Sequence, residues 1–364
     1  MHVGLLIYGD INSQSGGYLY DRQLVSFLQR QGDRVDILSL PQKSYARDLL
    51  SRGIPEAICC DPLDILIQDE LVYPRVFTRN STLKSRLNCP IVSLVHLLDS
   101  SRPQPWPRRW LARWAEGRYL NSVDGLILNS RYTRQKVGEL LAGDLPPHII
   151  AVPAADHLLP PASERLADSP ADKSPELKIL YAGNVIRQKG LHVLLQALER
   201  MDCGCFRLTI AGRLDMEPAY VKQLRRLITR RHLRQSIEFT GPLNSNALTA
   251  CYQQNDLLVL PSVHEAYGIV FIEAQGFGLP VIGTRAGGAA EIVQHGSNGY
   301  LIEPGDSNAL RDMLILLNHD RDLLKRMSSN ARNYYRQHPT WDESCGKIRA
   351  FLITTIQGER HHSC

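Results

Sequence analysis

The start of the sequence lacks the long apolar run of a membrane-spanning segment, which requires about 20 consecutive apolar residues. Its first apolar run, Val3 to Tyr8, ends in turn residues and is too short for a secretory signal sequence. The run instead has the length of a buried strand. We therefore expect a cytoplasmic protein that begins with a β-strand.

Cysteine pairs with the spacing of metal ligands are absent. The 364 residues include eight cysteines, among them one adjacent pair and one C-x-C, but no C-x-x-C. Zinc knuckles need two C-x-x-C pairs, and disulfide frameworks are typical of short secreted chains. The sequence thus predicts neither a zinc site nor a disulfide framework.

The chain also has no large excess of one charge. Lys and Arg number 42 and Asp and Glu 37, a formal net charge of +5. This falls short of a nucleic-acid-binding signature, although it suits anionic substrates or a membrane surface. No G-x-G-x-x-G follows the first strand, which argues against a nicotinamide-dependent dehydrogenase.

Short apolar runs alternate with stretches of helical period along the whole chain, a pattern typical of parallel α/β proteins. Most runs are continuously apolar, as expected of strands buried on both faces. In the first half they cover 3–8, 35–40, 65–68, 91–96, 126–128 and 149–152. In the second half they cover 177–182, 208–211, 237–240, 257–260, 281–283 and 300–302.

The two sets are separated by a proline-rich segment, 158–176, with little apolar periodicity. We therefore predict two Rossmann-like domains, 1–160 and 177–335. The remaining residues, 336–364, include an apolar helical stripe formed by Ile348, Phe351, Leu352 and Ile356. We expect this last helix to pack back on the N-terminal domain.

The most specific block of the sequence is 261–282. A strand ends at Pro261, a polar loop carries Glu265, and a helix is predicted to start after Gly268. The start of a helix offers unpaired N–H groups and the positive end of the helix dipole, which suit a diphosphate. Glu273 lies about one turn into a mostly apolar helix, where an unpaired acid would be costly.

This block resembles the Glu-x7-Glu signature of glycosyltransferase family 4, a large retaining family with the GT-B fold. Further matches follow in the order and spacing of the family. They are Leu180 to Gly190, Phe239 to Gly241, Gly287 to Val293, and Gly299 to Asp306. The resemblance implies two Rossmann-like domains that face each other across a cleft, with the donor bound mainly by the C-terminal domain.

The resemblance also implies roles for individual residues. Glu273 is similar to the acid that binds the donor ribose, Glu265 to the acid at the donor sugar and phosphates, and Lys189 to the lysine that neutralises the departing diphosphate. The chain differs from many relatives at Asn184, where they carry an arginine, and Arg187 is a candidate replacement. The resemblance assigns donor binding to Gly16, Gly17, Gly183, Arg187, Gly241, Gly268, Ile269, Val270 and Glu273, and catalysis to Glu265, Lys189 and His96.

The N-terminal half carries fewer such signals. Gly16 and Gly17 follow the first strand, where they either let the backbone approach the donor phosphates or form an ordinary turn. His96 closes a strand, and ligands meet parallel sheets at that end. It either contacts a sugar hydroxyl or caps local structure. Asp99 could orient His96, but we favour a role as a cap of the next turn.

Two features near the donor block have simpler interpretations. Gly287 and Gly288 either approach the donor sugar or allow tight packing, and the sequence favours neither. Asp320-Arg321-Asp322 has the D-x-D form of a metal site but begins a late helix, where acids act as caps. We therefore expect no metal site and no cofactor besides the nucleotide-sugar substrate.

Two basic segments remain. The basic residues between Lys222 and Arg234 surround the buried stripe Val221, Leu224 and Ile228, so they are predicted to form the solvent-exposed face of a helix. The second segment, 106–119, holds three of the four tryptophans among four arginines. Such a segment suits peripheral contact with an anionic membrane, although Trp110 and Trp114 could equally belong to a core.

The sequence therefore predicts a retaining glycosyltransferase that works without a metal. It would transfer a sugar from a nucleotide-diphosphate sugar to a glycan, lipid or small-molecule acceptor. Two alternatives stay open, a GT-B epimerase or phosphorylase and a non-catalytic nucleotide-sugar-binding relative, because a fold alone does not fix a reaction. The donor base, the donor sugar and the acceptor are not predicted.

Overall fold

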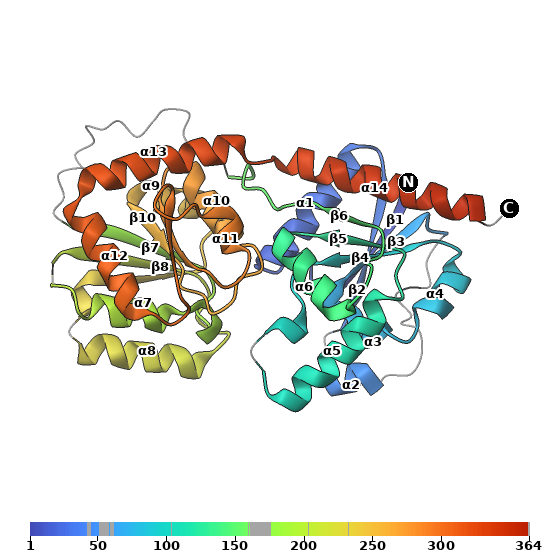
Figure 1. The fold of residues 1–364 in the computed structure, drawn as a ribbon, viewed down its shortest axis with the longest axis horizontal. Coiled ribbons are helices and arrows are strands. Elements are labelled where there is room, and N and C mark those ends of the chain that lie inside the picture. The colour runs from blue at the N-terminus through green and yellow to red at the C-terminus, as the bar shows by residue number, and fades with distance from the viewer. Residues whose placement is uncertain are drawn as a thin grey trace. The chain divides into compact units, whose positions relative to one another are not determined.

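The computed structural model describes residues 1–41, 45–50, 58, 62–102, 104–158, 160, 176–202, 204–231 and 233–362. The chain divides into two compact units, Met1–Pro153 with Pro339–Cys364, and Ala154–His338. Each unit contains one parallel six-stranded sheet with helices on both faces (Figure 1). The predicted linker at 158–176 lies largely outside the described residues.

The N-terminal unit has the strand order β2-β1-β3-β4-β5-β6. The strands are β1 His2–Tyr8, β2 Arg34–Leu40, β3 Ile65–Asp69, β4 Ile91–Val95, β5 Gly125–Leu128 and β6 His148–Ile150. Its helices are α1 Gly16–Arg30, α2 Tyr45–Leu50, α3 Tyr73–Val76, α4 Asn80–Leu87, α5 Trp106–Leu120, α6 Arg131–Leu141 and α14 Trp341–His362, with short 3-10 helices η2 Glu70–Val72 and η3 Asp99–Ser101.

The C-terminal unit has the strand order β12-β11-β10-β7-β8-β9. The strands are β7 Leu177–Ala182, β8 Phe206–Ala211, β9 Ile237–Gly241, β10 Leu257–Val259, β11 Val281–Thr284 and β12 Gly299–Ile302. Its helices are α7 Leu191–Leu198, α8 Pro218–Arg230, α9 Ser245–Gln254, α10 Ile269–Gly276, α11 Ala289–Ile292, α12 Ser307–His319 and α13 Arg321–Gln337, with 3-10 helices η5 Arg187–Lys189 and η6 Leu233–Ser236.

Both sheets follow from the strand pattern of the sequence. Each of the twelve predicted apolar runs forms a strand, with ends shifted by no more than two residues. Strands β3, β4, β5, β10, β11 and β12 are buried throughout. A strand buried on both faces is apolar at most of its positions, and this explains why the runs do not alternate.

The last helix, α14, belongs to the N-terminal unit. Ile348 and Leu352 are fully buried, and the guanidinium of Arg349 donates to both carboxylate oxygens of Asp33 at 2.7 and 3.2 Å. The ring of Phe351 fills the space that a side chain at Gly125 would occupy. The chain thus returns to the unit with which it began, which fulfils the expectation for this helix.

The division between the units differs from the predicted boundary at residue 160. The segment that starts at Ala154 groups with the C-terminal unit. There His157 lies 3.2 Å from the carboxylate of Glu273, and the ring of Pro160 packs against Gly276. These contacts are long-range in sequence, so the local pattern that placed the boundary did not contain them.

Candidate active site

In the C-terminal unit, Lys189 and Glu265 meet at the carboxyl end of the sheet. Lys189 closes η5 after β7, and Glu265 lies in the loop after β10. These two strands are neighbours, and the chain order reverses between them. A loop crevice at such a switch point is where open α/β sheets bind ligands. The ammonium of Lys189 lies 2.5 Å from Oε2 of Glu265, and both side chains are partly exposed.

The two loops are fastened to each other by backbone contacts. The amide of Val263 donates to the carbonyl of Gln188 at 2.8 Å, and the side chain of Gln188 donates to the carbonyl of His264 at 3.1 Å. Gly190 has φ +72°, and a Cβ there would lie 2.0 Å from the carbonyl oxygen of Pro261. Only glycine fits at this close approach, which fixes the position of Lys189.

The loop after β11 holds Glu265 from the other side. The amide of Gly288 donates to the carbonyl of Glu265 at 2.9 Å. A Cβ on Gly287, which has φ +104°, would lie 1.9 Å from the same carbonyl oxygen. Of the two interpretations of Gly287 and Gly288, the structure therefore supports tight packing.

Helix α10 begins where the sequence predicts. Gly268 precedes it with φ +94°, and the helix runs from Ile269. Its first N–H groups have no partners within the helix, and Ile269 and Val270 are only partly buried. The helix therefore offers amide donors on the same loop as Glu265.

Glu273 is buried in α10, with 5% of its surface exposed. The hydroxyl of Tyr252 donates to Oε2 at 2.6 Å, and Nε2 of His157 lies 3.2 Å from Oε1. Tyr252 and His157 carry no signal in the sequence, because each is brought to Glu273 by tertiary packing. A carboxylate has about four lone-pair positions, so Glu273 can accept further hydrogen bonds.

The other predicted donor residues of this unit lie at strand ends. Gly183 follows β7 with φ +152°, and Gly241 ends β9 with φ +74°. The amide of Gly212, after β8, donates to the carbonyl of Gly241 at 2.9 Å, and a Cβ on Gly212 would meet the carbonyl oxygen of Gly183 at 2.0 Å. The carboxyl ends of β7, β8 and β9 are therefore closely packed against one another.

Arg187 shares η5 with Lys189, but its side chain is directed toward α8. Its guanidinium donates to Gln223 at 2.9 Å and lies over the ring of Tyr220, while its amide donates to Glu217. All three partners lie in α8 or directly before it. The structure thus directs the Arg187 side chain toward α8.

In the N-terminal unit, His96 follows β4 at the carboxyl end of its sheet. Its Nε2 lies 3.1 Å from Oδ1 of Asp21 in α1, and Asp21 is fully buried. A Cβ on Gly17 would lie 3.3 Å from the imidazole ring, so Gly17 packs directly against it. Gly16 is the first residue of α1, which is capped by Ser15.

Asp69, at the end of β3, completes this cluster. The ligand atoms of Asp21, Asp69 and His96 lie within 4.8 Å of one another, close enough to hold a metal ion. Burial, together with the charge of Asp21, raises the pKa of Asp69 to about 7. Burial opposes the charged form of His96, but the hydrogen bond and the charges of Asp21 and Asp69 raise its pKa above the usual value.

Sequence reasoning missed both acids. Asp21 lies next to Tyr20 and three residues before Leu24, and both of these belong to the buried stripe of α1. An acid within a buried helical stripe is a signal that could have identified Asp21 from the sequence. Asp99 does not cap η3 with its side chain. It accepts the hydroxyl of Tyr73 at 3.3 Å instead, so our interpretation of Asp99 as a cap is wrong.

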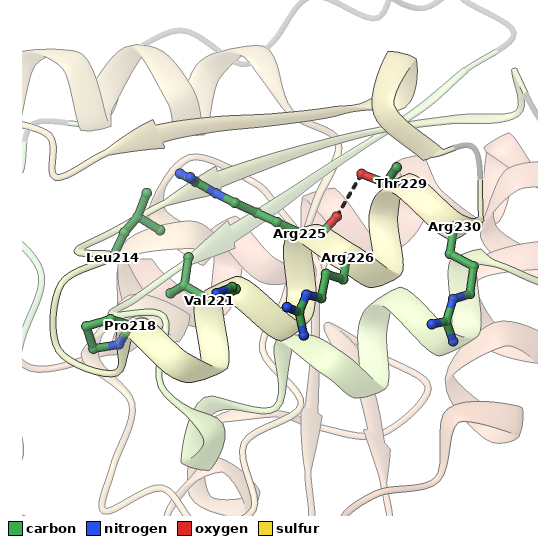
Figure 2. Close-up of a pocket in the computed structure, with 8 residues that line it drawn as sticks. Leu214, Pro218, Val221, Arg225, Arg226, Thr229 and Arg230 are labelled. Atoms are coloured by element: carbon green, nitrogen blue, oxygen red, sulfur yellow. Dashed lines mark hydrogen bonds between the residues drawn. The ribbon is translucent and has the colours of Figure 1, made fainter.

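Away from these residues, an open groove of about 680 Å³ runs along α8 (Figure 2). It is lined by Leu214, Pro218, Val221, Lys222, Arg225, Arg226, Thr229 and Arg230. None of these is a predicted donor or catalytic residue, and the basic side chains are exposed, as the sequence predicts. Likewise, Asp320 caps α13 by accepting the amide of Leu323 at 2.8 Å.

Comparison with known proteins gives the following matches. Residues 163–334 match the family model described as glycosyl transferases group 1. D-inositol 3-phosphate glycosyltransferase of Xylanimonas cellulosilytica is 30% identical over 248 residues, which are 64% of this chain and 57% of that protein. The chain spans about half the length of the curated relatives it matches.

Two solved structures resemble nearly the whole chain. Sucrose-phosphate synthase from Thermosynechococcus elongatus has a TM-score of 0.81 at 19% identity, covering 98% of this chain and 99% of that one. Anabaena HepE in complex with UDP-glucose has a TM-score of 0.77 at 19% identity, covering 97% and 100%. These likenesses and the two parallel sheets show that the fold is GT-B.

Proposed function

Since the chain is related to the group 1 glycosyltransferases, we propose that it transfers a sugar from a nucleoside-diphosphate sugar to an acceptor hydroxyl. The observation that carries this proposal is the pairing of Lys189 with Glu265 at the strand reversal of the C-terminal sheet. A cation, a carboxylate and the start of α10 are gathered at the carboxyl end of this sheet. This combination suits a ligand that carries both phosphates and hydroxyls.

The diphosphate of the donor is proposed to lie at Lys189 and the first amides of α10. Its negative charge is attracted by the ammonium and by the positive end of the helix dipole. Glu273 would then accept hydrogen bonds from the ribose hydroxyls, while Tyr252 and His157 hold its carboxylate in place. Because HepE is described in complex with UDP-glucose, a UDP-sugar is the first donor to test.

In the proposed reaction, the bond between the anomeric carbon and the diphosphate oxygen breaks, and its electron pair leaves with the diphosphate. The acceptor hydroxyl oxygen forms the new bond on the same face, so the anomeric configuration is retained. Its proton passes to the departing phosphate oxygen. Lys189 stabilises the negative charge that develops on the leaving group, a role for which a fixed cation is effective.

The acceptor is proposed to bind to the N-terminal unit at the carboxyl end of its sheet, where His96 lies. The hydrogen bond between its ring nitrogen and Asp21 and the contact with Gly17 hold the imidazole in one orientation. The imidazole can therefore hydrogen-bond a sugar hydroxyl. The acceptor class is a glycan, a lipid or a small molecule. We propose that no divalent metal is needed, because Lys189 supplies the positive charge at the diphosphate.

The test is a donor-hydrolysis and transfer assay with a panel of nucleotide sugars, performed with and without EDTA. Lys189→Ala is expected to lower turnover of the best donor by roughly 100-fold or more, the effect of removing one group that stabilises developing charge. Glu265→Gln, which removes the ion-pair partner of Lys189, is also expected to lower turnover. Lys222→Ala is the matched control, since Lys222 is an exposed lysine on α8. It should leave turnover unchanged.

The proposal is wrong if no nucleotide sugar binds or turns over and neither site substitution has an effect. Binding without turnover by the wild-type protein would support the non-catalytic alternative. Release of a free epimerised sugar, or dependence on inorganic phosphate, would support an epimerase or a phosphorylase. If EDTA abolishes activity and Mg²⁺ restores it, only the proposal that no divalent metal is needed would be wrong.

A further inference from the structure

Helix α5 exposes three tryptophans in a single stripe. The side chains of Trp106, Trp110 and Trp114 are 77%, 62% and 50% exposed. They are spaced four residues apart, which places them on one face of a helix. The Trp114 ring packs edge-on against Phe77 at 5.6 Å but stays half in solvent. A contiguous apolar stripe of this kind marks an interaction surface rather than ordinary surface.

The stripe is not part of the core. The buried residues of α5 are Ala112, Ala115, Glu116, Tyr119 and Leu120. They form the opposite side of the helix and pack into the N-terminal unit. The alternative that Trp110 and Trp114 are core residues is therefore wrong.

Every charge on the exposed side of α5 is positive. The exposed side chains of the helix other than the tryptophans are Pro107, Arg108, Arg109, Arg113 and Arg118. Arg108 lies 4.0 Å from Asp99 and over the ring of Tyr45. In the part of the chain that the structure describes, Arg109, Arg113 and Arg118 have no salt bridge.

The one acid of the helix, Glu116, faces inward. It is fully buried and accepts hydrogen bonds from the backbone amides of Asp99 at 2.5 Å and Ser100 at 3.2 Å. In the sequence, Glu116 weakens the basic character of the segment, whereas in the structure it is absent from the exposed side. The docking face, defined as the exposed residues 106–118 of α5, thus combines indole rings with arginines and includes no acid.

We propose that this docking face binds an anionic lipid bilayer. Indole rings are favoured at the interface between lipid and water, and basic side chains beside them pair with lipid phosphates. Two copies of the docking face would repel each other through their arginines, which disfavours self-association. Among the described residues, no helix is both long enough and apolar enough to cross a bilayer, so the contact is peripheral. The proposal does not depend on transferase activity.

The test compares vesicles of phosphatidylcholine alone with vesicles that contain about 30% phosphatidylglycerol, a typical anionic lipid. The full chain is expected to bind the anionic vesicles roughly tenfold or more tightly, and about 0.5 M NaCl should weaken this binding by screening. Three of the four tryptophans lie on the docking face, and the fourth, Trp341, is buried. The tryptophan emission should therefore shift to shorter wavelength on binding.

Two variants separate the contributions of the rings and the charges. Trp106→Ala/Trp110→Ala/Trp114→Ala and Arg109→Glu/Arg113→Glu/Arg118→Glu should each weaken binding by roughly tenfold or more. The first removes the interfacial indole rings, and the second reverses three charges that are attracted to anionic lipid. The matched control is Lys222→Glu/Arg226→Glu/Arg230→Glu, which reverses three exposed positive charges on α8, where the groove has no tryptophan. Circular dichroism would verify that the variants are folded.

Several outcomes would overturn the proposal. They are failure of the wild-type chain to bind anionic vesicles, unchanged binding by either α5 variant, and equal loss of binding in the α8 control. Self-association in solution that the tryptophan variant abolishes would show that the docking face is an interface between copies. A wild-type chain that binds vesicles but has no transferase activity would support docking and contradict only the proposed function.

Discussion

At the scale of single residues, the imidazole of His96 is held by a buried acid, Asp21, and by its own contacts with Gly17 and Tyr20. The Tyr20 ring meets the imidazole edge-on at 5.3 Å. Burial lowers the pKa of His96, but the hydrogen bond to Asp21 and the charges of Asp21 and Asp69 together outweigh it and raise the pKa above the usual value. The His96 side chain is therefore held in position before any ligand binds, and its protonation depends on Asp21.

Asp21→Asn should lower the pKa of His96, because only the charge of Asp69 then opposes the effect of burial. In the wild type the raised pKa means that the pair stabilises the fold fully below pH 6.5, and that this contribution is lost as the pH rises through the folded-state pKa. We expect the variant to lose roughly 1–3 kcal/mol of unfolding free energy near pH 6 and less near pH 9. Histidine NMR titration and urea unfolding at both pH values would measure this.

Asp342→Asn is the control, since the Asp342 side chain is 68% exposed and pairs with an exposed Arg30. It should change stability by no more than about 0.5 kcal/mol. An Asp21→Asn protein in which His96 titrates as in the wild type would show that Asp21 does not set its charge.

Residues of the candidate site could be predicted from the sequence where they belong to a recognisable motif. Lys189, Glu265 and Gly268 lie together at the carboxyl end of the C-terminal sheet, and the sequence motifs predict each of them. Partners such as Tyr252 and His157 could not be found this way. They approach Glu273 from elements 21 and 116 residues away, and no local periodicity encodes that approach.

At the scale of elements, the position of Glu265 depends on how closely the loop after β11 packs against it. Gly287→Ala adds a Cβ 1.9 Å from the carbonyl oxygen of Glu265 and strains a backbone with φ +104°. We expect a loss of roughly 2–4 kcal/mol in stability and weaker binding of nucleoside diphosphate. Thermal unfolding and calorimetric titration with UDP would measure the two effects.

Gly296→Ala provides the comparison. Gly296 also has a positive φ, +81°, but nothing lies within 4 Å of an added Cβ. This substitution should cost only the backbone strain, about 1 kcal/mol, and leave binding intact. Equal effects of the two substitutions would mean that strain, and not displacement of Glu265, explains the loss.

At the scale of the whole molecule, the chain begins and ends in the same unit. The N-terminal amine of Met1 and the guanidinium of Arg349 both contact Asp33, and α14 packs against α1 and β6. The last helix is thus part of the N-terminal core, although it follows the C-terminal unit in sequence. Its loss should destabilise the unit that it joins.

Leu352→Ala tests this arrangement. Leu352 is fully buried, so its truncation should cost about 2–5 kcal/mol. Hydrogen exchange should accelerate in α1 and β6 and stay unchanged in β7 and β10. Thr354→Ala, at an exposed position of the same helix, should change neither. Faster exchange confined to the C-terminal unit would contradict the assignment of α14.

By itself, the sequence determined the strands of both sheets, the start of α10 and the motif residues at the strand ends. Each of these depends on neighbours within a few positions, whose periodicity and turn chemistry are visible along the chain. Only the tertiary structure decided which groups meet. It paired His96 with Asp21, turned Glu116 inward and left the tryptophans of α5 in solvent, because these outcomes follow from packing between segments far apart in the sequence.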